Sequence, residues 1–388
     1  MRDFRFLPEP PTRPGNGHLQ DWALSPLPLI GEGAARARSA GVDVFRLRLG
    51  LPAVVGVGAA WNRAVLTDLG TFRSAGSLSR IVPYLSGGVI LSDAPGHGGR
   101  RSLMNPGFGR AHLLALQART RAALPGVPDG EFDALAWADG AVLRMLNAAY
   151  FSGEFDAGLL HAFLAPLRRP FPVPAIPRPL LFARVDAELR RLARVRLTGR
   201  GHDDLLAVLA PLPGGLEEAR VSLAAAHDTT THALAYAIWF LAQHPQWHAP
   251  EHHGAVLKEV LRLFPPGWMG SRRLSRDLDW NGVRLPRGAL ALYSPYLSGR
   301  DRAAQADLTD QLLGPLAAVR GGEELRRTAE ALCDTGFSQV ETASRLGIHA
   351  NTLRYRMERI EALTGRSLAL PETRSLWWLA LQLERLQG

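Results

Sequence analysis

Cysteine is nearly absent from this chain of 388 residues, in which Cys333 is the single example. One thiol excludes an intramolecular disulfide framework and a zinc site built from several cysteines, so no metal site is predicted. Long apolar runs are lacking as well, because the longest, Ala233 to Ala242, is far too short to cross a bilayer. The N-terminus has no apolar segment of signal length. We therefore expect a cytoplasmic protein that does not enter membranes.

Lysine is also scarce, since Lys258 is the one lysine among 45 basic residues. The formal net charge of +9 points to a nucleic-acid partner only if the excess lies where nucleic acid would bind. Residues 310–388 contain ten arginines and ten acids, so the whole excess lies upstream. Net charge alone therefore identifies no partner. The length and the 46% hydrophobic content allow two domains, each with its own core.

The residue pattern predicts a mainly α fold with small β-hairpins. Two β-leaning runs within residues 43–58 are broken by Gly50, and a second hairpin turns at Asn281-Gly282, a pair that suits a type I′ turn. Residues 216–243 have the apolar spacing of one long helix. The C-terminal fifth of the chain alternates helical patterns with glycine stop signals, which predicts an all-α segment there.

Six consecutive polar side chains, His227 to His232, interrupt the long predicted helix. In the simplest interpretation, the hydroxyls bond back to carbonyls one turn earlier and the acid faces solvent. Two other stretches of the sequence help to decide whether this simple interpretation or a functional one is right. Glu259 and Arg262 share one helical face and can form a buried pair, so loss of Glu259 is expected to unfold the N-terminal domain. His97 and Arg101 lie four residues apart and can jointly bind an anion.

In this order and at these spacings, the stretches resemble a cytochrome P-450 over residues 1–301. In that family an acid and an alcohol, here Asp228 and Thr229, pass protons to iron-bound oxygen, although Ala226 stands where a Gly is usual. Glu259 and Arg262 match the structural Glu-x-x-Arg pair of the family. The resemblance also implies that three side chains hold the propionates of a haem: His97, Arg101 and Arg272.

The resemblance ends at Asp301, before the loop that carries the haem ligand. Working members have a Phe-x-x-Gly-x-x-x-Cys-x-Gly loop whose thiolate binds iron. Cys333 does not fit that pattern, because Arg326 and Ala329 occupy the positions of its Phe and its first Gly. We expect no thiolate-bound haem, while a His-ligated or weakly held haem stays open. The apolar surface that the missing segment would cover must then be hidden by something else.

Residues 338–364 have the pattern of a helix, a tight turn and a second helix. On the second helix Leu353, Met357 and Ile360 form one stripe that should face the core. The side chains on the other faces suit a DNA recognition helix: Asn351, Thr352, Arg354, Tyr355, Arg356 and Arg359. The alternative is an ordinary helical hairpin with a solvated basic face.

The stretch from Asp310 to Leu386 resembles the C-terminal helix-turn-helix domain of PucR-type transcriptional regulators, most clearly in "HANTLRYRMERIEALTG". The resemblance implies DNA binding through residues 338–364, normally as a homodimer. We place a junction at 302–312, between a P-450-like domain at 1–301 and the helix-turn-helix domain at 313–388. The last helix carries leucines at near-heptad spacing that can pack on its own domain or on a second subunit: Leu376, Leu379, Leu383 and Leu386.

Taken together, the sequence favours a DNA-binding transcriptional regulator with a degenerate P-450-like domain that senses a small apolar ligand. Two alternatives stay open. One is a haem-dependent monooxygenase that oxidises a small apolar substrate and needs a redox partner. The other is a non-functional gene fusion, because the two resemblances meet abruptly near Asp301.

Overall fold

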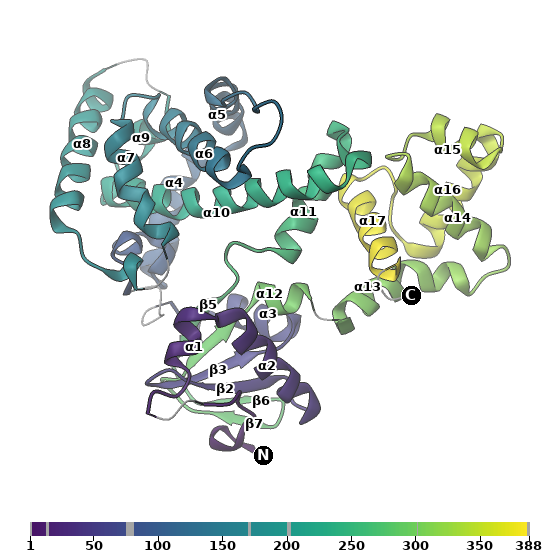
Figure 1. Ribbon diagram of the computed structural model, residues 1–388, viewed down its shortest axis with the longest axis horizontal. Coiled ribbons are helices and arrows are strands. Elements are labelled where there is room, and N and C mark those ends of the chain that lie inside the picture. Colours follow the sequence, from purple (N-terminus) through teal and green to yellow (C-terminus); the bar gives the residue numbers. More distant parts are fainter. Residues whose placement is uncertain are drawn as a thin grey trace. The chain divides into compact units, whose positions relative to one another are not determined.

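The computed structural model describes residues 2–12, 15–74, 81–169, 172–199, 203–300 and 302–385 (Figure 1). The chain forms two compact units. The first contains Met1–Ala235 and Pro266–Leu297, and the second contains Tyr236–Pro265 and Ser298–Gly388. The second unit therefore combines segments from both sides of the predicted junction at 302–312. Among the described residues, every helix is too short or too polar to span a bilayer.

The β-structure lies in the first unit and forms two sheets. The larger has the strand order β2-β3-β8-β5-β4, with bounds β2 (Val44–Arg48), β3 (Pro52–Gly56), β4 (Phe72–Arg73), β5 (Gly270–Leu274) and β8 (Leu290–Tyr293). The smaller has the order β1-β7-β6, with bounds β1 (Arg2–Asp3), β6 (Leu278–Trp280) and β7 (Val283–Leu285). β3 pairs with β8 and β1 with β7 in parallel, and the other pairings are antiparallel.

Both predicted hairpins are confirmed. β2 and β3 pair antiparallel across a turn in which Gly50 has a φ of +80°. β6 and β7 pair across Asn281 and Gly282, whose φ values of +44° and +79° are the two positive angles that a type I′ turn requires. The turn residues thus specify each hairpin locally, before any packing against the rest of the unit.

The other regular secondary structure of the first unit is helical. The helices are α1 (Leu19–Leu24), α2 (Pro26–Ser39), α3 (Ala59–Thr67), α4 (Gly96–Met104), α5 (Arg110–Ala123), α6 (Ala134–Phe151), α7 (Ala157–Leu164), α8 (Pro179–Thr198) and α9 (Leu205–Leu209). α10 (Gly215–Gln243) confirms the long predicted helix, and its last residues belong to the second unit. Short 3₁₀ helices lie in several connections.

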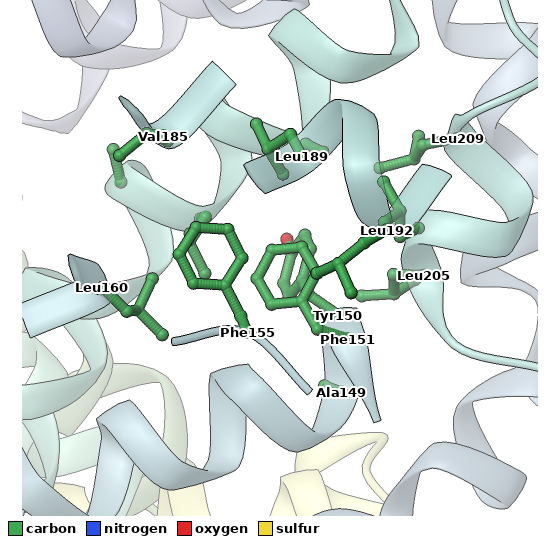
Figure 2. Packing of buried hydrophobic residues seen from close by; sticks show 14 of the residues in the cluster. Ala149, Tyr150, Phe151, Phe155, Leu160, Val185, Leu189, Leu192, Leu205 and Leu209 are labelled. Carbon is green, nitrogen blue, oxygen red and sulfur yellow. The ribbon is translucent and has the colours of Figure 1, made fainter. Parts of the chain in front are cut away.

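Two kinds of core hold the first unit together. The rings of Phe151 and Phe155, with centroids 4.8 Å apart, point among leucines of α7, α8 and α9 in a helical core (Figure 2). Against the larger sheet, the buried indole of Trp61 on α3 donates from Nε1 to the Leu292 carbonyl at 2.8 Å. A Cβ on Gly56 would lie 1.9 Å from that ring, so the close approach requires glycine.

The second unit is helical throughout its described part. Besides the end of α10, its helices are α11 (His253–Leu263), α13 (Arg302–Ala317), α14 (Gly322–Asp334), α15 (Gln339–Leu346), α16 (Ala350–Thr364) and α17 (Pro371–Arg385), and α12 (Pro295–Gly299) begins in the first unit and ends in the second. The predicted junction at 302–312 lies within α13, whose Leu312 and Leu316 are buried. Asp301 itself lies outside the described residues.

Candidate functional site

Local capping residues define the helix-turn-helix segment. Ser338 caps α15, and its hydroxyl accepts from the Glu341 amide at 3.4 Å. α15 ends at Gly347, which has a φ of +64°, a conformation that glycine adopts without strain. His349 then caps α16, with its Nδ1 accepting from the Asn351 amide at 3.2 Å. The predicted helix, turn and helix of residues 338–364 are therefore present.

α16 has a buried face and an exposed face, as its residue spacing predicts. Leu353 and Ile360 are 1% and 0% exposed, and Met357 packs against the same core from the edge. The exposed positions near the N-terminal end of α16 are those expected for base contacts: Asn351, Thr352, Arg354 and Tyr355. An amide, a hydroxyl and a guanidinium are the groups that read base edges in the major groove.

Two arginines of the predicted DNA-binding set have partners on other segments of the protein. Arg356 donates to Glu324 at 2.9 Å and contacts the Thr328 hydroxyl on α14. Arg359 donates to the carbonyl of Arg320 at 3.0 Å. These bonds tie α16 to α14 and to the segment before α14, so the side chains left to face a duplex lie mainly in the first turn and a half of α16.

Among the described side chains of α17, aromatic and aliphatic residues pack into the core of the second unit. Trp377, Trp378 and Leu381 are at most 5% exposed and lie in the core of the second unit. Leu376 is only partly buried at its edge. The side chains of Leu379 and Leu383, and all of Leu386, lie outside the described residues. The described core contacts of α17 are therefore Trp377, Trp378 and Leu381, with Leu376 at the edge.

The core of the second unit joins segments that carry the two different resemblances. Val256 and Val260 of α11 belong to one buried cluster with Leu312, Trp377 and Leu381 from α13 and α17. The Trp247 ring meets the Trp378 ring edge to face at 4.8 Å. The apolar face of α11 is therefore covered by helices from the C-terminal part of the chain.

The Glu259–Arg262 pair is present on α11. Two hydrogen bonds link the guanidinium to the carboxylate, Nε to Oε2 at 2.7 Å and Nη2 to Oε1 at 2.6 Å, and Glu259 is 7% exposed. Arg262 also donates to the Gly299 carbonyl. All three residues lie in the second unit, so the stabilising effect predicted for this pair concerns the unit that contains the helix-turn-helix rather than the unit that contains the N-terminus.

The alcohol and the acid of the polar run on α10 interact within their own helix. Thr229 is exposed, and its hydroxyl donates to the Ala225 carbonyl at 2.8 Å. Asp228 Oδ1 lies 3.4 Å from Nδ1 of His232, and the hydrogen bond with Asp228 raises the pKa of His232. The arrangement matches the simpler interpretation of mid-helix hydroxyls.

A buried cluster around His227 was missed by sequence reasoning. His227 is 1% exposed, its Nε2 lies 3.1 Å from Oδ1 of Asp139 on α6, and Arg168 Nη1 lies 3.0 Å from the same oxygen. Burial lowers the pKa of His227, although Asp139 opposes the shift. The available signal was Asp139 itself, the one acid in the mainly apolar stretch that forms α6.

The three residues predicted to hold haem propionates all lie in the first unit. His97 and Arg101 are on α4, where the Arg101 guanidinium lies 5.7 Å from the centre of the Phe108 ring. Arg272 is on β5, and its Nε is buried with no hydrogen-bond partner in the described part of the chain. No hydrogen bond or ion pair among the described residues joins these three side chains. The orphaned Nε of Arg272 is compatible with an anionic group.

Cys333 does not fit the role of an iron ligand. It lies on α14 within the helix-turn-helix domain, is 4% exposed and belongs to the core cluster of the second unit. Ligand thiolates of haem enzymes face the porphyrin from a loop, whereas this side chain packs within a helical core. The residues present therefore fit an anion on Arg272 but do not fit a thiolate-bound haem.

Comparisons with known proteins match different parts of the chain to different kinds of protein. Residues 325–383 match the PucR C-terminal helix-turn-helix domain. Over 84 residues the chain is 39% identical to the transcriptional activator PmfR of Paenarthrobacter nicotinovorans, covering 21% of this chain and 18% of that protein. Over 292 residues it is 25% identical to cyclooctat-9-en-7-ol 5-monooxygenase of Streptomyces melanosporofaciens, covering 60% of this chain and 63% of that protein. The chain thus spans less than two thirds of that monooxygenase.

Similarity to solved structures shows the fold of the larger part. Cyanobacterial CYP120A1 with bound retinoic acid superposes with a TM-score of 0.60 at 21% identity, over 76% of this chain and 78% of that chain. Other cytochromes P-450 of known structure share the fold. The chain therefore has a cytochrome P-450-like fold over most of its length and a PucR-type helix-turn-helix domain at residues 325–383.

Proposed function

We propose that this chain is a DNA-binding transcriptional regulator in which α16 is the recognition helix. The observation that carries the proposal is the exposed set on α16, Asn351, Thr352, Arg354 and Tyr355, in a domain that matches PucR-type regulators. Arg354 donates to Asn351 Oδ1 at 3.1 Å, which orients both side chains together. As a homodimer, the protein presents two such helices to half-sites about 34 Å apart, one turn of the duplex.

A mobility shift with DNA from upstream of the gene tests the proposal. Arg354→Ala should weaken binding at least about fivefold, because one good base contact contributes about 1–3 kcal/mol. Arg327→Ala is the matched control, since Arg327 on α14 is 69% exposed and the variant loses the same charge. An equal effect of both variants, or the absence of any shift with the wild type, would contradict a recognition role for α16.

A shared core supports a genuine protein over an accidental gene fusion. Two unrelated segments joined by a frameshift have no reason to present complementary apolar faces. In this chain Trp247 and Val256, which precede the junction, are buried with Trp377 and Trp378, which follow it. Cooperative melting of the second unit, with Trp fluorescence and helicity changing together, is the expected behaviour.

A haem-dependent monooxygenase is the second candidate, favoured by the P-450-like fold and by the orphaned Nε of Arg272. When bound, a haem supplies oxygen activation, and His97, Arg101 and Arg272 are the side chains in this chain that would hold its propionates. Against it stands the position of Cys333 in the core of the helix-turn-helix domain. We expect the reduced protein with carbon monoxide to lack the Soret band of a thiolate-bound iron. Appearance of that band would support the monooxygenase instead.

A further inference from the structure

A cavity of about 320 Å³ lies within the second unit, between α11, α14 and α17. Its apolar wall is aromatic and comes from Trp247, Phe337 and Trp378. Cys333 also lines it, and no residue of α16 does. The cavity is therefore formed jointly by a helix with the P-450 resemblance and by helices of the helix-turn-helix domain, away from the predicted DNA-reading side chains.

The charged side chains that line this cavity are all positive. Lys258 and Arg374 line it, and no aspartate or glutamate does. The Nε of Arg374 donates to the Leu368 carbonyl at 2.7 Å, and its guanidinium lies 5.3 Å from the centre of the Phe337 ring. No ion pair within the described part of the chain neutralises either cation. Two positive groups beside flat apolar walls suit a molecule with an anionic end and an aromatic body.

The backbone of one wall residue departs from the ordinary conformation. Phe337 has a φ of +64°, a conformation that is strained for a bulky residue and is retained mainly at functional positions. The strained residue places its ring at the cavity, beside Arg374.

We propose that this cavity binds a small organic anion with a flat aromatic body. The carboxylate of such a molecule pairs with Arg374 and Lys258, and its ring packs between Trp247, Phe337 and Trp378. The proposal is independent of DNA binding, because it concerns residues that the proposed recognition surface does not use.

Calorimetric titration of the full chain, without DNA, with 2-naphthoate and with the neutral 2-naphthamide tests the proposal. The acid should bind at least about tenfold more tightly than the amide, because a charge-assisted pair replaces a neutral contact. Lys258→Gln, a change at an exposed position, should weaken binding of the acid and leave that of the amide unchanged. Equal affinities for acid and amide, or no binding of either, would overturn the proposal.

A pair of matched glycine variants locates the binding. Gly254 lines the cavity, and a Cβ there meets nothing within 4 Å, so Gly254→Phe should fill the space and abolish binding of 2-naphthoate. Gly314 on α13 is equally open and lies outside the cavity, so Gly314→Phe should bind like the wild type. If both variants melt like the wild type and Gly254→Phe still binds 2-naphthoate, the ligand sits elsewhere and the proposal is wrong.

The single cysteine gives a direct readout of the same cavity. Because Cys333 is the one thiol in the chain, its labelling by a maleimide reports on the cavity wall alone. At 2-naphthoate concentrations about ten times Kd, roughly one protein in eleven is unoccupied, so the labelling rate should fall about tenfold. An unchanged labelling rate under saturating ligand would contradict the assignment. Loss of DNA binding in the mobility shift would leave these results unaffected and would count against the regulator alone.

Discussion

α10 and α16 each carry a run of polar side chains on a helix with an apolar face, but the two runs differ in burial and in their interaction partners. On α10, His227 is 1% exposed beside Asp139, and Thr229 bonds back to its own helix. On α16, Asn351 and Arg354 are exposed and bond to each other. The composition of a polar run therefore does not determine its role. His227 of the α10 run lies against another helix of the protein, whereas the α16 run is exposed and is the surface that we propose binds DNA.

The largest expected effect comes from α11, which links the two resemblances. Glu259→Ala leaves the partly buried Arg262 without its carboxylate partner and should destabilise the second unit by up to about 3 kcal/mol. Loss of DNA binding should accompany the loss of stability, although the substitution lies outside the helix-turn-helix domain. Thermal melting and the mobility shift measure the two effects.

Glu323→Ala is the control for that prediction. Glu323 is an exposed acid in the same unit that pairs with Arg327 at 3.6 Å, with both side chains about 70% exposed. Removal of an exposed pair changes stability by less than about 1 kcal/mol. If Glu259→Ala lowers the stability of the second unit no more than Glu323→Ala does, the Glu259–Arg262 pair on α11 does not stabilise the unit that contains α16.

A smaller effect is expected at Cys333. A packing role predicts that Cys333→Ala costs about 1 kcal/mol in stability and leaves DNA affinity unchanged, because only one buried atom is removed. An iron ligand would behave differently, since its loss would remove any thiolate-type Soret band and the stabilisation that a bound haem supplies. Denaturant unfolding and absorption spectra of wild type and variant distinguish the two roles.

The smallest effects are pH-dependent and lie on α10. The pKa of His227 is lowered, so as pH falls through its ordinary value of 6.5 the unfolded chain takes up a proton that folded His227 resists, and stability decreases. The pKa of His232 is raised, so its contribution is fully present below 6.5 and is lost as pH rises through the folded value.

Two matched variants separate these opposite contributions. Between about pH 7.5 and 5.5, His227→Gln should lose less stability than the wild type, and His232→Gln should lose more. Melting of the first unit at each pH is the measurement. If both variants lose the same amount of stability over this pH range, the opposite pKa shifts described for His227 and His232 are wrong.

Local signals in the sequence predicted much of the fold. Asn281-Gly282 specified a hairpin, Gly347 specified the turn before α16, and the spacing of Leu353 and Ile360 specified which face of α16 is buried. These predictions succeed because the physical cause lies within a few residues. The polar run on α10 could be found but not interpreted, because the interactions of His227 depend on Asp139, 88 positions earlier in the chain.

Contacts between distant segments could not be predicted. The Glu259–Arg262 pair was expected, yet its membership of the second unit depends on α11 packing against α17, more than a hundred residues later. The partners of Arg356 and Arg359 on other segments also required the structure, because spacing on one helix does not show which neighbour is present. The aromatic cavity between α11, α14 and α17 has no signature in any single stretch.

The most direct test of the central claim is the binding constant of the full chain for upstream DNA and for a scrambled duplex, measured over a range of salt concentrations. We predict that affinity falls steeply with salt for both duplexes and that the upstream duplex is preferred. Asn351→Ala should reduce that preference at least about fivefold, because an amide that reads adenine contributes about 1–3 kcal/mol. Salt-insensitive binding, or a preference that Asn351→Ala leaves intact, would contradict the assignment of α16 as the helix that reads DNA.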